Sequence, residues 1–185
     1  MVKLGIIADT HVPDRARGVP EALCSTFREA GVSAILHAGD ICIPSILQEL
    51  EKIAPVYAVR GNRDIYYLRN LPIQLSLEFE GVPIGLVHGH GKLASYMLDK
   101  VDHLRHGVRV ERYQNRVLQA FPDAKLVVFG HLHRRIHEWV GQKFLFNPGS
   151  ACCPDWFGGG PPSAGLISLQ DGEITRVEFL DLDQE

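Results

Sequence analysis

Seven side chains of the kinds that bind metal ions occur in five short motifs, and each motif directly follows an apolar run of the chain. In chain order they are Asp9, His11, Asp40, Asn62, His88, His131 and His133. Short apolar runs that end in a turn residue indicate buried strands. Ligands bind outside the carboxyl ends of the strands in open α/β sheets, so we expect the five motifs to meet in one crevice.

The residue types indicate the chemistry of this crevice. Asp and Asn supply oxygen ligands, His supplies an imidazole nitrogen, and no Cys belongs to the set, which suits hard to borderline divalent cations. Seven ligands exceed what one tetrahedral zinc ion accepts, whereas two cations about 3.5–4 Å apart can share a bridging carboxylate. We therefore predict two divalent metal ions, with Mn²⁺ favoured and Ni²⁺, Co²⁺, Fe²⁺ or Zn²⁺ as alternatives. Gly39, Gly61 and Gly130 precede ligands, where a missing Cβ permits a tight turn and close approach to an anion.

Each motif alone also has a purely structural interpretation. An Asp-x-His pair is often a turn residue followed by a surface histidine, and Gly-Asp and Gly-Asn are ordinary turn dipeptides. His-Gly-His and Gly-His-x-His are stronger signals, although loop histidines also produce them. The occurrence of all five motifs in one chain, each after a predicted strand, favours the metal site.

The elements that position these motifs follow from the apolar pattern. The first half alternates strands with helices, which predicts βαβ units and a largely parallel sheet. The expected strands there are 2–8, 34–37 and 56–59, and the helices are 20–30 and 44–54. A hairpin of 74–79 and 84–87, one or two surface helices within 92–121 and a strand at 125–129 follow. The remaining strands, 135–140, 143–146, 164–169 and 174–179, should be antiparallel in character, and 154–162 is a Gly/Pro-rich loop.

Composition limits the class of protein. A chain of 185 residues with 45% hydrophobic content fits one domain spanning 1–185. The formal charge of −3 and the lack of a long Lys/Arg run give no indication of non-specific nucleic-acid or membrane binding. No apolar stretch approaches the ~20 residues of a membrane helix, so we expect a soluble, cytoplasmic protein. The four cysteines form no Cys-x-x-Cys pair, and we expect reduced thiols.

The order of the motifs, D-x-H, G-D, G-N, H and G-H-x-H, resembles that of the calcineurin-like metallophosphoesterase superfamily. The likeness spans nearly the whole chain and is strongest to a short phosphodiesterase branch. It rests on Asp9-Thr10-His11-Val12-Pro13, His88-Gly89-His90 and Asn147-Pro148-Gly149-Ser150. The resemblance implies an α/β fold, a single-domain four-layer αββα sandwich with both metals at the strand ends.

The resemblance also implies a ligand set for each metal. Asp9, His11, Asp40 and His133 would hold the first ion, and Asp40, Asn62, His88 and His131 the second, with Asp40 as the bridge. Two such cations would acidify a bridging water, present hydroxide to phosphorus in line and neutralise charge on the phosphate oxygens. We therefore expect a metal-dependent phosphoesterase, with Asp40 and Asn62 among the catalytic residues.

Arg63 and His90 refine the expected reaction. Many phosphomonoesterases of the superfamily have His after the Asn, but this chain has Arg63. Arg cannot act as a general acid near neutral pH, although its donors can bind a phosphate oxygen. Diesters or substrates with good leaving groups are therefore favoured. His90 either orients the substrate, donates a proton or supports His88.

Other residues have two interpretations each. Trp156 and Phe157 either stack on a nucleobase or aryl group, which suits a nucleotide-like phosphoester, or pack against the sheet. Arg15 and Arg17 either reach an anionic substrate or form a plain exposed loop. His37 lies inside an apolar run and is expected to be a core histidine. Surface positions are expected for the three remaining histidines, His103, His106 and His137.

Two rival functions remain. The retromer subunit involved in vacuolar sorting resembles this fold and uses it as a protein-interaction scaffold, so a metal-binding scaffold with little or no activity is the alternative. The enzyme-like Asp40 and Asn62 favour catalysis. A nucleotide-binding βαβ protein is disfavoured because no phosphate-binding glycine motif follows the first strand. A small phosphoester is the expected partner, and a homo-oligomer is compatible with the sequence.

Overall fold

The apolar runs of the sequence form two five-stranded sheets in the computed structural model, which describes residues 1–91, 93–153 and 160–182. The first sheet has the order β10-β9-β1-β2-β3. Its strands are β1 (Val2–Ile7), β2 (Ala34–His37), β3 (Val56–Ala58), β9 (Ser163–Gln170) and β10 (Glu173–Asp181). The second has the order β4-β5-β6-β8-β7. Its strands are β4 (Gln74–Phe79), β5 (Val82–Val87), β6 (Leu126–Phe129), β7 (Arg135–Val140) and β8 (Lys143–Pro148).

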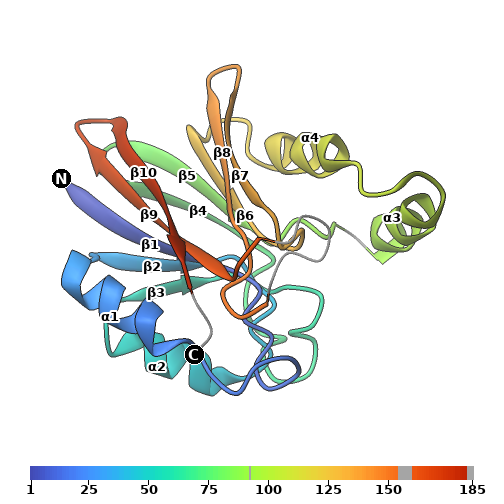
Figure 1. Ribbon diagram of the computed structural model, residues 1–185. Helices are drawn as coiled ribbons and strands as arrows, with labels where there is room; N and C mark the ends of the chain where they lie inside the picture. Colours follow the sequence, from blue (N-terminus) through green and yellow to red (C-terminus); the bar gives the residue numbers. More distant parts are fainter. Residues whose placement is uncertain (92, 154–159, 183–185) are drawn as a thin grey trace.

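The helices lie on the outer sides of the two sheets (Figure 1). They are α1 (Glu21–Ala30), α2 (Pro44–Glu51), α3 (Leu93–His106) and α4 (Val110–Ala120). The helices α1 and α2 pack on the first sheet, and α4 packs on the second through buried Tyr113 and Val117. The helix α3 lies beyond α4 at the edge of the molecule (Figure 1). The expected four-layer αββα sandwich is therefore confirmed.

The strand β1 is largely apolar because both of its faces are covered by other parts of the protein. Leu4 and Ile6 point between the two sheets, whereas Ile7 points to the layer of α1 and α2. A strand that is covered on both faces buries every side chain, which removes the polar alternation of a surface strand. On the helical side, a Cβ at Gly5 would lie 2.7 Å from the ring of Phe27, so helix α1 packs directly on the backbone of β1.

Most predicted elements are present with small changes at their ends. Helix α1 ends at Gly31, whose φ of 62° is the left-handed conformation that favours glycine. The region 92–121 forms two helices, and Pro44 begins α2. None of the helices in the described part of the chain is long and apolar enough to cross a membrane.

The pairing of β8 differs from the expectation of an antiparallel second half. It pairs antiparallel with β7 but parallel with β6. The chain turns back at the β7–β8 hairpin and inserts β8 between β6 and β7, so β8 runs in the same direction as β6. Alternation of side chains predicts a strand but not its neighbours, which is why the sequence did not reveal this parallel pair.

Candidate metal centre

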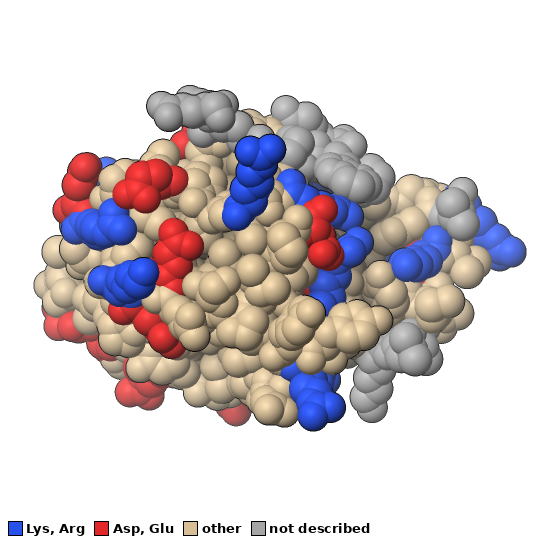
Figure 2. Space-filling view, turned by 90° about the horizontal axis from the view of Figure 1, so that it is seen from below, with Lys and Arg blue, Asp and Glu red and all other residues tan. Residues whose placement is uncertain are grey.

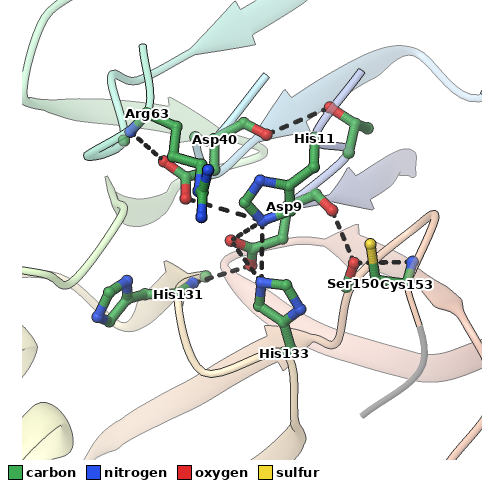
Figure 3. Close-up of polar contacts among 12 residues, drawn as sticks. Asp9, His11, Asp40, Arg63, His131, His133, Ser150 and Cys153 are labelled. Atoms are coloured by element: carbon green, nitrogen blue, oxygen red, sulfur yellow. Dashed lines mark hydrogen bonds and ion pairs between the residues drawn. The ribbon is translucent and has the colours of Figure 1, made fainter. Parts of the chain in front are cut away.

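The five motif loops meet at the carboxyl ends of β1, β2, β3, β5 and β6. Parallel pairing aligns β1 with β2 and β3 in the first sheet, and β5 with β6 in the second. The two sheets contribute to one site, because the backbone N–H of His131 donates to Asp9 Oδ2 at 2.9 Å (Figure 3). Residues 122 positions apart in the chain are thereby brought into contact.

Asp9, His11 and His133 form the first group of candidate ligands. Nε2 of His11 lies 3.0 Å from Nε2 of His133, and Asp9 Oδ1 lies 3.8 Å and 3.5 Å from these two nitrogens (Figure 3). Asp9 Oδ1 is buried and has no hydrogen-bond partner among the described residues. A buried carboxylate oxygen without a partner is unfavourable, and a cation among these three atoms would satisfy it. The donor set therefore fits a metal ion.

Asp9, Asp40 and His88 form the second group. His88 Nε2 lies 3.5 Å from Asp40 Oδ1, 4.0 Å from Asp9 Oδ1 and 3.2 Å from Asn62 Oδ1. The ring of His131 stands edge-on to that of His88, with 5.0 Å between the ring centroids.

Asp40 reaches both groups. Its Oδ1 faces His88, and its Oδ2 lies 3.8 Å from His11 Nε2. One carboxylate with an oxygen towards each group is the arrangement that a bridging ligand needs. All seven predicted ligands therefore lie around one centre, and their assignment to individual ions stays a prediction.

The backbone is strained at most of these positions. Five of the seven candidate ligands have positive φ, a region that non-glycine residues rarely adopt: Asp9, His11, Asp40, His131 and His133. Such strain, about 1–3 kcal/mol per residue, persists where the surroundings hold it, and it concentrates at functional sites. Here the N–H of Asp9 donates to Gly39 O and the N–H of His11 donates to Asp40 O, each at 3.0 Å.

The glycines that precede the ligands allow the motif loops to pack on one another. A Cβ at Gly61 would overlap Asp40 Oδ1. At Gly130 it would lie 2.9 Å from both Ala38 O and Asp9 Oδ2. The described contacts show that these glycines make room for the neighbouring ligand loops, and a close approach to an anion stays a prediction.

Asp64 is a supporting residue that the sequence analysis missed. Its carboxylate is fully buried and accepts four backbone N–H bonds. Oδ1 accepts from Ile41 at 2.8 Å and Cys42 at 2.7 Å, and Oδ2 accepts from Asp40 at 2.9 Å and Gly61 at 2.7 Å. One side chain thus holds the loop after β2 and the loop after β3 together. Asp64 belongs to the G-N-x-D motif, so its spacing from Asn62 could have indicated a role at the site, but an aspartate in a turn is usually exposed.

His37 and Thr10 form a second support. His37 is fully buried, as expected for a core histidine, and burial lowers its pKa to about 3. Nδ1 accepts the N–H of Gly39 at 3.2 Å, so Nε2 carries the hydrogen and donates it to Thr10 Oγ1 at 3.3 Å. This histidine therefore links the loop after β1 to the loop after β2.

The motif at 147–150 positions the remaining loops. Asn147 Nδ2 donates to Gly130 O at 2.8 Å, and Ser150 Oγ donates to Asp9 O at 2.6 Å (Figure 3). The N–H of Cys153 donates to Ser150 Oγ at 3.1 Å. Family resemblance alone indicated this motif in the sequence, and the hydrogen bonds give it a physical role.

The acid–base properties of the centre reflect burial and opposite charges. Burial raises the pKa of Asp9 to about 8. Burial lowers the pKa of His88, but the carboxylates of Asp40 and Asp9 prevail and raise it to about 9. For Asp40, burial raises the pKa and His88 lowers it, with a net result below the ordinary value. The centre therefore holds exchangeable protons near neutral pH.

Arg63 and His90 lie beside the ligands. The backbone N–H of Arg63 donates to Asp40 Oδ1 at 2.8 Å, and its guanidinium lies 3.2 Å from Asp14 Oδ2. The ring of His90 lies 5.2 Å from that of His88, and its buried Nδ1 has no hydrogen-bond partner among the described residues. Burial lowers the pKa of His90 to about 4, so it is neutral at pH 7. The catalytic roles of both residues stay predictions.

The remaining arginines, histidines and cysteines singled out in the sequence lie mostly outside the centre. Arg15 and Arg17 are exposed, and so are His106 and His137, whereas half-buried His103 contacts the hydroxyl of Tyr113 at 3.0 Å. The cysteines are free. Trp156 and Phe157 lie outside the described residues.

Comparison with known proteins agrees with this geometry. A family model described as the calcineurin-like phosphoesterase superfamily domain matches residues 2–172. A probable metallophosphoesterase of Methanothermobacter thermautotrophicus is 37% identical over 96% of this chain and 91% of its own length. A phosphodiesterase of Methanocaldococcus jannaschii is 23% identical over 95% of this chain and 98% of its own length.

A solved structure supports the fold. Vps29 of Entamoeba histolytica in complex with Zn²⁺ has a TM-score of 0.69 and 22% identity, and the alignment covers 98% of this chain and 100% of that one. At this identity the likeness establishes the fold alone. With the family match over most of its length, the chain belongs to the calcineurin-like phosphoesterase superfamily.

Proposed function

We propose that this protein is a phosphodiesterase that depends on two divalent metal ions, with Mn²⁺ as the favoured metal. The observation that carries the proposal is the convergence of two ligand groups on one buried centre, with Asp40 reaching both. Asp9, His11, Asp40 and His133 would hold one ion, and Asp40, Asn62, His88 and His131 the other. When bound, the ions supply an acidified water as nucleophile and neutralise charge on the phosphate.

The chain itself positions the reacting groups. The backbone N–H of Arg63 fixes the Asp40 carboxylate, and its guanidinium stands at the edge of the centre with donors that suit a phosphate oxygen. His90 is neutral at pH 7, so its ring can both donate and accept a hydrogen bond near the ester oxygens.

The surface charge is compatible with an anionic substrate. Figure 2 shows the underside of the molecule, where most acidic side chains lie towards the side of α1 and α2 with basic ones among them, while mainly basic and uncharged residues, with an acidic group among them, lie between that side and α3. Such a distribution favours the approach of an anion towards the basic side. A small phosphoester, nucleotide-like in its organic part, is the substrate class that we propose.

The preference for diesters rests on Arg63. Many phosphomonoesterases of the superfamily have a histidine at this position that protonates the leaving oxygen, whereas the guanidinium of Arg63 does not give up its proton near neutral pH. The name of the archaeal relative, a phosphodiesterase, agrees with this preference.

The proposal is tested with metal-stripped protein that is reconstituted with Mn²⁺. We expect hydrolysis of bis-p-nitrophenyl phosphate to exceed that of p-nitrophenyl phosphate, and Asp40→Ala to abolish both. Asp123→Ala, which changes an exposed carboxylate in the turn before β6, serves as the matched control. A metal-loaded protein that hydrolyses neither ester, or an active Asp40→Ala variant, would contradict the proposal.

A metal-binding interaction scaffold is the second candidate. The fold likeness to Vps29, a vacuolar protein sorting protein, points to it. Helix α3 also exposes Met97, Leu98 and Val101, which are 55%, 63% and 46% accessible, and clustered exposed apolar side chains favour contact with a protein. Metal binding without hydrolysis of any ester in the assay above would favour this function.

A further inference from the structure

A cavity of about 590 Å³ opens directly beside the candidate metal centre. Asn62 and Arg63 form the side of the cavity next to the metal ligands. Three tyrosines, Tyr66, Tyr67 and Tyr96, form much of the remaining lining. Small-molecule sites commonly have volumes of about 300–1,000 Å³ and combine aromatic walls with a few polar groups. We call this cavity the tyrosine pocket.

Two of the three tyrosines that line the pocket are highly exposed. Tyr66 and Tyr67 are 79% and 73% accessible, and the preceding Ile65 is 54% accessible. Large aromatic side chains that remain uncovered side by side favour a binding surface over a folding role. Their exposure therefore favours the binding of another molecule at this surface.

The exposed tyrosines stand on a fixed turn. Asp64 precedes them and is anchored by four backbone N–H groups, and the buried Leu68 follows them. The N–H of Leu68 donates to Asp64 O at 3.2 Å, which closes the turn. The backbone that carries Tyr66 and Tyr67 is thus fixed next to the candidate ligand Asn62 by the same residue, Asp64, that fixes the ligand loops.

The polar groups of the pocket suit the organic part of an ester. Asp14 and Arg63 form an ion pair with 3.2 Å between Oδ2 and Nη1, and their side chains are 46% and 41% accessible. The guanidinium has further N–H donors for a phosphate oxygen, and the carboxylate accepts hydrogen bonds from N–H or O–H groups. A phosphate group next to the metal site could therefore accept hydrogen bonds from Arg63, and a ring stacked on the tyrosines could donate hydrogen bonds from its polar edge to Asp14.

We propose that the tyrosine pocket binds a nucleoside-sized ester group that stays on phosphorus and carries an aromatic ring, and so makes the enzyme select nucleoside phosphodiesters. The inference rests on the proposed phosphodiesterase function. Stacking on aromatic side chains tolerates any base, because every base has a π-face. Among the groups that stay on phosphorus, the pocket therefore distinguishes one that carries an aromatic ring from a plain alkyl group, without selecting one particular base.

Two substrates with the same leaving group test the pocket. Thymidine 5′-(p-nitrophenyl phosphate) and methyl p-nitrophenyl phosphate both release p-nitrophenolate, so they differ in the group that stays on phosphorus. We expect kcat/KM to be higher for the thymidine ester. Tyr66→Ala and Tyr67→Ala should each lower kcat/KM for it by about fivefold or more, the scale of a lost base-stacking contact, and leave the methyl ester within about twofold. Tyr57→Ala, an exposed tyrosine on β3 outside the pocket, is the matched control.

Calorimetry separates failure of the pocket from failure of the function. In Mn²⁺-loaded protein, both pocket variants should weaken binding of thymidine 5′-monophosphate and leave inorganic phosphate binding unchanged. Thymidine 5′-monophosphate binding that is equal in wild type and both variants would overturn the pocket, whether or not the protein is active. Absence of hydrolysis with tyrosine-dependent binding would support the pocket and contradict the phosphodiesterase proposal.

Discussion

Replacing Asp64 by Asn should weaken both the fold and the metal centre, although Asp64 is no predicted ligand. Each carboxylate oxygen of Asp64 accepts two backbone N–H bonds, one pair from Ile41 and Cys42 and the other from Asp40 and Gly61. Asn has almost the same shape but keeps one acceptor oxygen and turns an NH₂ group towards the other pair. Two of the four bonds are therefore lost in either orientation of the amide.

The size of the effect follows from these bonds. Hydrogen bonds to a charged group contribute about 1.5–3 kcal/mol each, so losing two gives roughly 3–6 kcal/mol. For a chain of this length, about 2–4 °C of melting temperature correspond to each kcal/mol, which gives a decrease of roughly 6–24 °C. Total stability is about 5–15 kcal/mol, so this loss is a large fraction of it.

Thermal unfolding followed by circular dichroism measures this effect, and isothermal titration with Mn²⁺ measures metal affinity. Asp123→Asn is the control, since Asp123 is exposed and an exposed substitution changes stability by about 0.5 kcal/mol or less. We expect Asp64→Asn to lower both the melting temperature and Mn²⁺ affinity, because the loop that carries Asp40 loses its support. A variant that melts with the wild type and binds Mn²⁺ equally would refute the reasoning.

Three further predictions concern the same loops. The pKa values of Asp9 and His88 are raised to about 8 and about 9, so a metal ion must displace protons from these side chains and Mn²⁺ affinity should rise with pH up to about 9. Calorimetry in buffers of different ionisation enthalpy should detect proton release on Mn²⁺ binding at pH 7. Binding without proton release would contradict this prediction. His37, with its pKa lowered to about 3, stabilises the fold fully above its ordinary pKa of 6.5, and this contribution is lost as pH falls towards 3, by about 1.4 kcal/mol per pH unit. Urea unfolding between pH 7 and 5 should therefore show a smaller pH dependence in His37→Gln, and an unchanged slope would contradict this. Gly61→Ala should lower the free energy of unfolding by about 1–3 kcal/mol and sharply lower diesterase activity, because the added Cβ would overlap Asp40 Oδ1. A wild-type kcat in this variant would contradict the close packing of the Asp40 and Gly61 loops.

The ligands of the candidate centre could be predicted because they follow a simple rule of α/β sheets. Each one comes at the carboxyl end of a strand, and the strands are recognisable as short apolar runs. The positive φ of residues such as Asp9 and His133 could not be predicted, because neither is a glycine. That conformation depends on hydrogen bonds between loops that are far apart in the sequence.

The supporting residues were harder to recognise for a related reason. Asp64 and His37 have no local signature that separates a buried hydrogen-bonding role from a turn or a core position. Their partners lie in other loops, 22 to 24 residues away for the Asp64 contacts with Asp40, Ile41 and Cys42. Likewise, the parallel β6–β8 pair depends on where a hairpin inserts, and alternating side chains do not encode that.

Electron paramagnetic resonance during a Mn²⁺ titration of metal-stripped protein tests the two-metal centre most directly. If Asp40 bridges two ions, the wild type should bind two Mn²⁺ per chain and give the spectrum of a spin-coupled pair. Asp40→Asn should lose the coupling. A single uncoupled Mn²⁺ per saturated chain, or none, would contradict the account.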